Sequence, residues 1–179
     1  MKRLIQKGNS MINGNAQWQD LKDKYVFWDI DGTLAPYRFN GHVADPDGTD
    51  NGMSLKEIED DVFLYRAPSQ HMQKVLTTCD AKQHIVMSHC RIEKEIEQKE
   101  IWLNTYYPEI KERLLVYENQ LKADTILQYC KEHGIDLEDV VFVDDVIAFL
   151  REAERKGIKS FHISSFLDWD YQESVRDKV

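Results

Sequence analysis

Two aspartates separated by one residue, Asp29 and Asp31, end an apolar run that covers residues 25–30. Side chains two positions apart in an extended chain point to the same side, so these carboxylates should lie together. Like charges at short range need a bound cation, or one group must hold a proton. Gly32 follows at once and permits a sharp backbone turn. This spacing indicates an acidic site at the tip of a strand.

Other polar residues follow later apolar runs in the same manner. They are Ser88 after residues 84–87, Lys122 beyond residues 114–117, and Asp144 with Asp145 after residues 140–143. If these runs are parallel strands of one sheet, their carboxyl ends share an edge, which is where such sheets bind ligands. An acid, a hydroxyl, a cation and a second acidic pair would then meet there.

This set of groups predicts phosphoryl chemistry supported by a metal ion. Several carboxylates without a Cys or His cluster form a hard-oxygen site, which favours Mg²⁺ over Zn²⁺. The metal would shield a phosphate dianion from an attacking carboxylate. Lys122 and Ser88 would hold the phosphoryl oxygens as charge redistributes. A carboxylate nucleophile divides hydrolysis into two steps through an aspartyl-phosphate.

The elements that must position these groups alternate between strand and helix. Apolar runs indicate strands over residues 25–30, 84–88, 114–117, 140–143 and 160–163. Helical spacing and stop signals predict helices over residues 69–79, 92–103, 122–133 and 149–157. Such alternation is typical of βαβ crossovers. The predicted fold class is therefore α/β, with a doubly wound, mainly parallel five-stranded sheet.

We expect one core domain over residues 23–179, preceded by a flexible or helical lead-in over residues 1–22. Turn-forming residues such as Pro36 and Gly41 replace the regular alternation over residues 36–66. Long loops of this kind usually carry function or are disordered, and we interpret this one as a flap or minimal cap. Its candidate substrate contacts are Tyr37, Arg38, His42 and Tyr65.

These motifs resemble those of the haloacid dehalogenase superfamily. Residues 29–34, DIDGTL, are similar to its first motif, and residues 142–145, FVDD, to its fourth. Ser88 resembles the second motif and Lys122 the third. The resemblance extends from about residue 25 to about residue 163, so it covers most of the chain and implies the Rossmann-like fold of that superfamily.

The resemblance implies a role for each aspartate. Asp29 would be the nucleophile, and Asp31 would be the general acid for the leaving group and then the base for water. The carboxylate of Asp29, the backbone carbonyl of Asp31 and the carboxylate of Asp145 would bind Mg²⁺, with Asp144 in support, although the order of Asp144 and Asp145 stays open. Dehalogenating relatives lack an acid at the position of Asp31, because a halide leaves without a proton. Asp31 therefore favours phosphomonoesters as substrates.

Composition narrows the possible partners. Apolar residues make up 42% of the 179 residues, and no apolar run is long enough to span a bilayer, so no membrane partner is expected. The net charge of −9 disfavours nucleic acid. The scattered Cys79, Cys90 and Cys130 favour a reducing, cytoplasmic setting. The expected partner is a small phosphorylated substrate, and the oligomeric state is left open.

Several alternatives stay open. A phosphotransferase would use the same site, and the segment over residues 102–108 resembles nucleotidase-like relatives and hints at a nucleotide substrate. A non-catalytic binding protein is favoured only by Val146 and Phe149, which stand where the family often has polar residues. Lys111 is the less favoured alternative to Lys122. A helix face is expected to be solvated and without a further role; it comprises Lys94, Glu95, Glu97, Lys99 and Glu100.

Overall fold

A computed structural model describes residue 16 and residues 18–36 and 55–169. At its centre is a five-stranded parallel sheet with strand order β3-β2-β1-β4-β5. The strands are β1 (Tyr25–Trp28), β2 (Gln83–Cys90), β3 (Glu112–Tyr117), β4 (Val140–Asp144) and β5 (Lys159–His162). The predicted fold class is confirmed, and the sheet is parallel throughout. The chain reverses its direction across the sheet between β1 and β4, so a crevice at that switch point is the expected ligand site.

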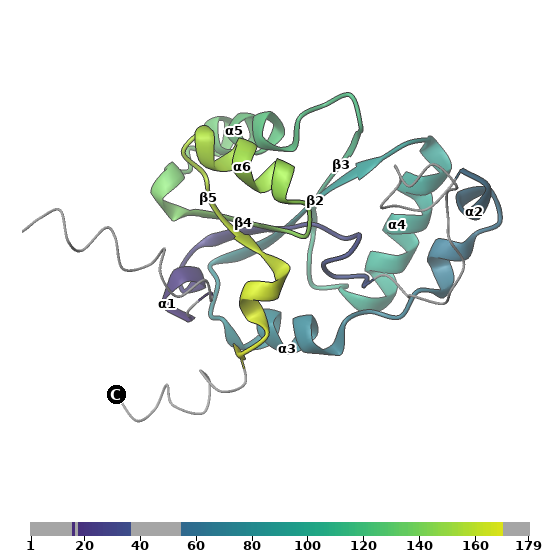
Figure 1. The fold of residues 1–179 in the computed structure, drawn as a ribbon, viewed down its shortest axis with the longest axis horizontal. Helices are drawn as coiled ribbons and strands as arrows, with labels where there is room; N and C mark the ends of the chain where they lie inside the picture. The colour runs from purple at the N-terminus through teal and green to yellow at the C-terminus, as the bar shows by residue number, and fades with distance from the viewer. Residues whose placement is uncertain (1–15, 17, 37–54, 170–179) are drawn as a thin grey trace, which may run out of the picture.

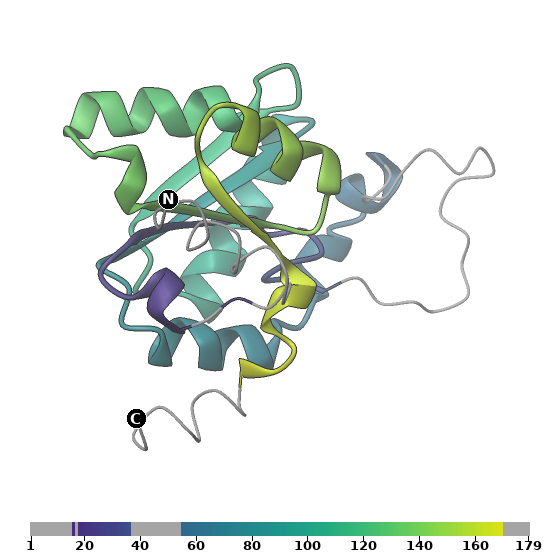
Figure 2. The ribbon, with the colours of Figure 1, turned by 60° about the vertical axis from the view of Figure 1, so that its left-hand side comes forward.

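Helices cover both faces of this sheet (Figures 1 and 2). The α-helices are α1 (Trp18–Leu21), α2 (Leu55–Glu59), α3 (Gln70–Thr78), α4 (Glu93–Tyr106), α5 (Lys122–His133) and α6 (Ile147–Arg155). Short 3-10 helices are η1 (Val62–Tyr65), η2 (Leu137–Asp139) and η3 (Ile163–Phe166). No helix among the described residues is long and apolar enough to cross a membrane.

The two faces of the sheet are packed by two separate apolar clusters. Trp28 of β1 lies in the cluster that includes residues from α3 and α4. Phe27, its neighbour in sequence, lies in the cluster that includes residues from α5 and α6. Successive strand residues point to opposite faces, so a nearly continuous apolar run is what a strand covered on both sides requires. This packing fixes the carboxyl end of β1 between two helical layers.

Two expectations about individual elements were wrong. β2 continues to Cys90, so Ser88 lies within the strand and not at its end. The helix face expected to be solvated is instead partly buried, because Glu95 is buried and the side chain of Lys99 is 0% exposed. Both residues share the stripe of α4 that carries Trp102 and turns toward the sheet.

The predicted flap is described only in its last part. Tyr37, Arg38 and His42 lie outside the described residues, whereas Tyr65 is 80% exposed. Residues 55–66 lie against α4, where Gln98 Nε2 donates to the carbonyl of Ile58 at 2.6 Å. The end of the insertion is therefore attached to the same helix that contributes Lys99.

Candidate active site

Backbone hydrogen bonds set the tip of β1. The amide of Asp29 donates to the carbonyl of Val143 at 2.9 Å, which continues the pairing of β1 with β4 by one residue. The chain then turns, because the amides of Thr33 and Ala35 both donate to the carbonyl of Ile30, at 3.2 and 2.7 Å. Gly32 has φ 73° inside this turn, a region that favours glycine. The sequence DIDGTL thus places Asp29 beside the end of β4.

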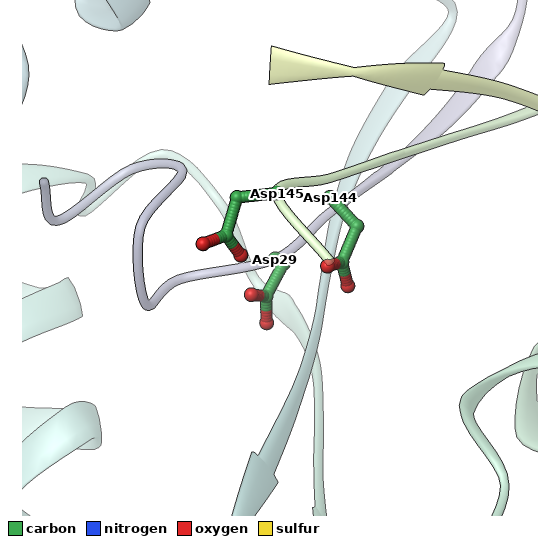
Figure 3. Close-up of side chains that lie close together, drawn as sticks. All are labelled: Asp29, Asp144 and Asp145. Carbon is green, nitrogen blue, oxygen red and sulfur yellow. The ribbon is translucent and has the colours of Figure 1, made fainter. Parts of the chain in front are cut away.

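Three carboxylates meet at this switch point. One oxygen each of Asp29, Asp144 and Asp145 lies within 4.8 Å of the others. Figure 3 shows the three side chains reaching from neighbouring strand ends to the same side of the sheet. Asp29 and Asp144 are buried, and Asp145 is half-buried. The structure therefore brings together the acidic groups that the sequence placed at two separate strand tips.

Asp144 and Asp145 differ in what their oxygens contact. Asp144 Oδ2 accepts a hydrogen bond from Lys122 Nζ, and its Oδ1 accepts one from the amide of Val146, both at 2.7 Å. Asp145 Oδ1 is buried and accepts no hydrogen bond from the described residues. The backbone carbonyl of Asp145 accepts from His162 Nε2 at 2.9 Å. Asp144 is thus occupied on both oxygens, while Asp145 keeps one buried oxygen available to a cation.

Lys122 joins the two acidic strand tips. Its amine lies 2.7 Å from Asp29 Oδ1 as an ion pair, and it forms both an ion pair and a hydrogen bond with Asp144. Burial by itself lowers the pKa of Lys122, but the charges of Asp29 and Asp144 outweigh it and raise that pKa. The amine also lies 4.8 Å from the centre of the Phe149 ring. Phe149 therefore packs against Lys122 where relatives are expected to be polar.

Burial, together with nearby like charges, raises the pKa of two of these acids. Burial raises the pKa of Asp29 to about 6, with Lys122 acting against it and the charge of Asp144 adding to it. Burial, followed by the charge of Asp29, raises the pKa of Asp145 to about 6. A metal ion that bound both carboxylates would relieve this repulsion and restore their ionised forms.

Asp31 lies in a different electrostatic setting. Its Oδ1 is 3.0 Å from Arg66 Nη1, and its Oδ2 is 2.6 Å from Lys99 Nζ. Burial alone would raise the pKa of Asp31, but the charges of Lys99 and Arg66 outweigh it and lower the pKa below its usual value. Both carboxylate oxygens are thus held by cations, and Asp31 is ionised.

The other predicted residues are placed as follows. Ser88 is buried, and its Oγ accepts a hydrogen bond from Lys99 Nζ at 3.2 Å. Lys111 is exposed and its amine donates to the carbonyl of Pro108 at 2.5 Å. Of the two lysines considered from the sequence, only Lys122 contacts the acidic cluster.

The residues present fit a divalent cation. Five carboxylates, those of Asp29, Asp31, Glu95, Asp144 and Asp145, lie among three cationic side chains, Arg66, Lys99 and Lys122. The formal charge of this group, five negative against three positive, is −2, and a divalent cation would cancel it. The buried open oxygen of Asp145 and the all-oxygen donor set both suit Mg²⁺.

Comparison with known proteins identifies the fold. The sequence matches no protein-family model and no curated protein. A haloacid dehalogenase-like family hydrolase from Streptococcus pneumoniae matches with a TM-score of 0.52 and 13% identity, over 82% of this chain and 90% of that one. At this identity the likeness shows the fold alone, so the expected haloacid dehalogenase-like fold is confirmed.

Two further solved structures match less well. One is the N-terminal part of a Bacteroides fragilis protein that contains a phosphatase domain complexed with Mg, with a TM-score of 0.48 and 18% identity over 86% of this chain and 40% of that one. The other is the cobalt-bound deoxy-D-mannose-octulosonate 8-phosphate phosphatase of Haemophilus influenzae, with a TM-score of 0.42 and 19% identity over 82% and 71%. With TM-scores below 0.5, neither of these two matches bears on the function of this chain.

Proposed function

We propose that this chain, which has the fold of haloacid dehalogenase-like hydrolases, is a Mg²⁺-dependent phosphatase of small phosphomonoesters. In this proposal Asp29 is the nucleophile and forms an aspartyl-phosphate that water then hydrolyses. The observation that carries the proposal is the position of Asp29 at the switch point, with Lys122 on one of its oxygens and Asp145 beside it.

The proposed metal ligands are the carboxylates of Asp29 and Asp145 and the backbone carbonyl of Asp31. Asp144 would support the site by holding Lys122, because both of its oxygens already accept hydrogen bonds. When bound, Mg²⁺ supplies positive charge that shields the phosphate dianion from the attacking carboxylate. Metal binding also favours the ionised, nucleophilic form of Asp29, whose pKa is otherwise raised to about 6.

Lys122 and Ser88 would contact the phosphoryl group. The Lys122 amine beside Asp29 supplies positive charge where negative charge develops on the phosphoryl oxygens. Ser88 accepts its hydrogen bond from Lys99, which leaves the hydroxyl hydrogen for donation to a phosphoryl oxygen. Lys122 and Ser88 would thus bind the phosphoryl group through protein side chains, in addition to any contact with the metal ion.

Asp31 would transfer protons in both steps. Its ionised resting state suits the second step, in which a base takes a proton from the attacking water. In the first step the leaving alkoxide needs a proton, and Asp31 supplies one only after an oxygen is released from Arg66 or Lys99. The ion pairs of Asp31 with Arg66 and Lys99 therefore influence which leaving groups can receive a proton at this site.

The proposal is tested by hydrolysis of p-nitrophenyl phosphate with Mg²⁺, comparing the wild type, Asp29→Asn and Asp139→Asn. Asp139→Asn is the control: it makes the same chemical change at the surface, where Asp139 pairs with Lys24. We expect Asp29→Asn to lose activity by at least about 10³-fold and Asp139→Asn to match the wild type. If the wild type is inert across a broad panel of phosphate esters, the chain is a binding protein that retains the fold.

A further inference from the structure

We infer that Lys99 is a positioning residue, whose amine binds both the carboxylate of Asp31 and the hydroxyl of Ser88 so that Asp31 is oriented for proton transfer to the leaving group. The inference rests on the proposed phosphatase function and extends it to a residue outside the four motifs. Lys99 belongs to α4, a helix that lies beside β2 and follows it in the chain.

The hydrogen bonds and ion pairs of the Lys99 amine join residues of the proposed site. Its amine is 2.6 Å from Asp31 Oδ2 and 2.9 Å from Glu95 Oε1. It donates to Ser88 Oγ at 3.2 Å and to the carbonyl of His89 at 2.5 Å. One ammonium group therefore joins the second aspartate of the first motif to the serine of the second motif.

Because the Lys99 side chain is buried, its charge depends on these contacts. The Lys99 side chain is 0% exposed, and a charge removed from water must be paired and hydrogen-bonded to be tolerated. A well-packed apolar side chain would serve stability at least as well, so stability alone does not account for a lysine here. Glu95 fixes the amine from the same helix, and its Oε2 accepts from the amide of Arg91 at 2.7 Å.

The two cations on Asp31 differ in how firmly they are placed. Arg66 is part of the segment that ends the insertion, and 14% of its side chain is exposed. Lys99 is enclosed and anchored by Glu95 and by two acceptors on β2. Lys99 thus keeps Asp31 oriented when the Arg66 contact gives way to a substrate or a proton.

This role predicts a dependence on the leaving group. An alkoxide leaves only with a proton, whereas p-nitrophenolate leaves without one, so in the first step proton transfer by Asp31 matters chiefly for alkyl phosphates, while its role as base in the second step is common to both esters. We expect Lys99→Met to lower the single-turnover rate of leaving-group release by about 10²-fold for 2-glycerophosphate and by less than about tenfold for p-nitrophenyl phosphate, with KM changed little for either. The matched control is Lys131→Met, at an exposed lysine of α5.

A double variant separates positioning from general damage. Because Lys99 acts through Asp31, Lys99→Met should cost nothing further in the Asp31→Asn background. Should Lys99→Met not fold, Glu95→Gln loosens the amine without removing it, and a smaller loss confined to the alkyl ester is expected. Equal losses for both esters in the single-turnover rate of leaving-group release, or additive losses in the double variant, would overturn the inference.

A crystal structure of the variant gives a readout independent of turnover. The inference predicts that the Asp31 carboxylate moves from its wild-type position in Lys99→Met, or in Glu95→Gln if only that variant folds. An unmoved Asp31 contradicts it. If the wild type hydrolyses neither ester, the proposed function itself has failed, which is a different outcome from unselective loss in a variant of an active enzyme.

Discussion

The amine of Lys122, at the start of α5, lies 2.7 Å from Oδ1 of Asp29, at the tip of β1. Both side chains are buried, and the same amine contacts Asp144 at the tip of β4. One cation therefore bridges carboxylates from two neighbouring strands. The stability of the domain and the proposed reaction both depend on this contact.

Removing the amine should destabilise the protein. Lys122→Met leaves Asp29 and Asp144 buried without their cation, and breaking a buried pair in this way costs about 3–5 kcal/mol. Urea unfolding of the metal-free protein measures the change in the free energy of unfolding. Lys111→Met, at an exposed lysine, serves as control and should change it by less than about 0.5 kcal/mol. Equal stability of Lys122→Met and wild type would contradict the structure.

Asp145→Asn should stabilise the metal-free protein while it abolishes metal-dependent activity. The pKa of Asp145 is raised to about 6, so the folded state binds this proton more tightly than the unfolded state does. Stability contributed by this group therefore falls as pH rises from about 4 to about 6. With allowance for solvent screening, we expect a gain of about 1 kcal/mol at pH 7, or roughly 2–4 °C in Tm.

The pH dependence of that gain provides the check. The difference in Tm between Asp145→Asn and wild type, both in EDTA, should be near zero at pH 4 and reach its full value above pH 6. Asp139→Asn removes a carboxylate whose pKa is lowered by its hydrogen bond to Lys24, so its effect should have the opposite sign. A difference that does not vary with pH would show that Asp145 carries no excess proton affinity.

Mg²⁺ binding should distinguish Asp144 from Asp145. Ligand that binds only the folded state raises Tm, so Mg²⁺ should raise the Tm of the wild type in a concentration-dependent manner. Asp145→Asn should lose that rise, because it removes the negative charge from the side chain that carries the open buried oxygen. Asp144→Asn should keep a weakened rise and lose stability, because it loosens Lys122. The reverse pattern would make Asp144 the direct ligand.

Much of this architecture could be predicted from the sequence, for identifiable reasons. β4 is buried on both faces and β1 nearly so. Strands covered in this way have nearly continuous apolar sequences, which is how both strands could be predicted. Gly134 ends α5 with φ 64°, as a glycine at that place indicates. Because the strands are parallel, groups at their carboxyl ends had to converge, and Asp29 and Asp145 do so.

The environment of Asp31 was less predictable. Arg66 comes from the segment that ends the insertion, and nothing in its spacing indicates which side of the sheet that segment reaches. Lys99 did carry a signal, because Glu95, Lys99 and Trp102 follow one another at helical spacing along the buried stripe of α4. Their charges suggested a solvated face, and the helical period was the better guide.

The proposed reaction passes through a covalent bond between Asp29 and phosphorus, and this intermediate can be trapped. The enzyme would be mixed with labelled phosphomonoester and Mg²⁺, quenched in acid within one turnover, and reduced with borohydride before peptide mapping by mass spectrometry. We predict label bound to wild-type protein and reduction to homoserine at position 29, with neither in Asp29→Asn. Turnover with no label on the protein, or label on another residue, would contradict the account.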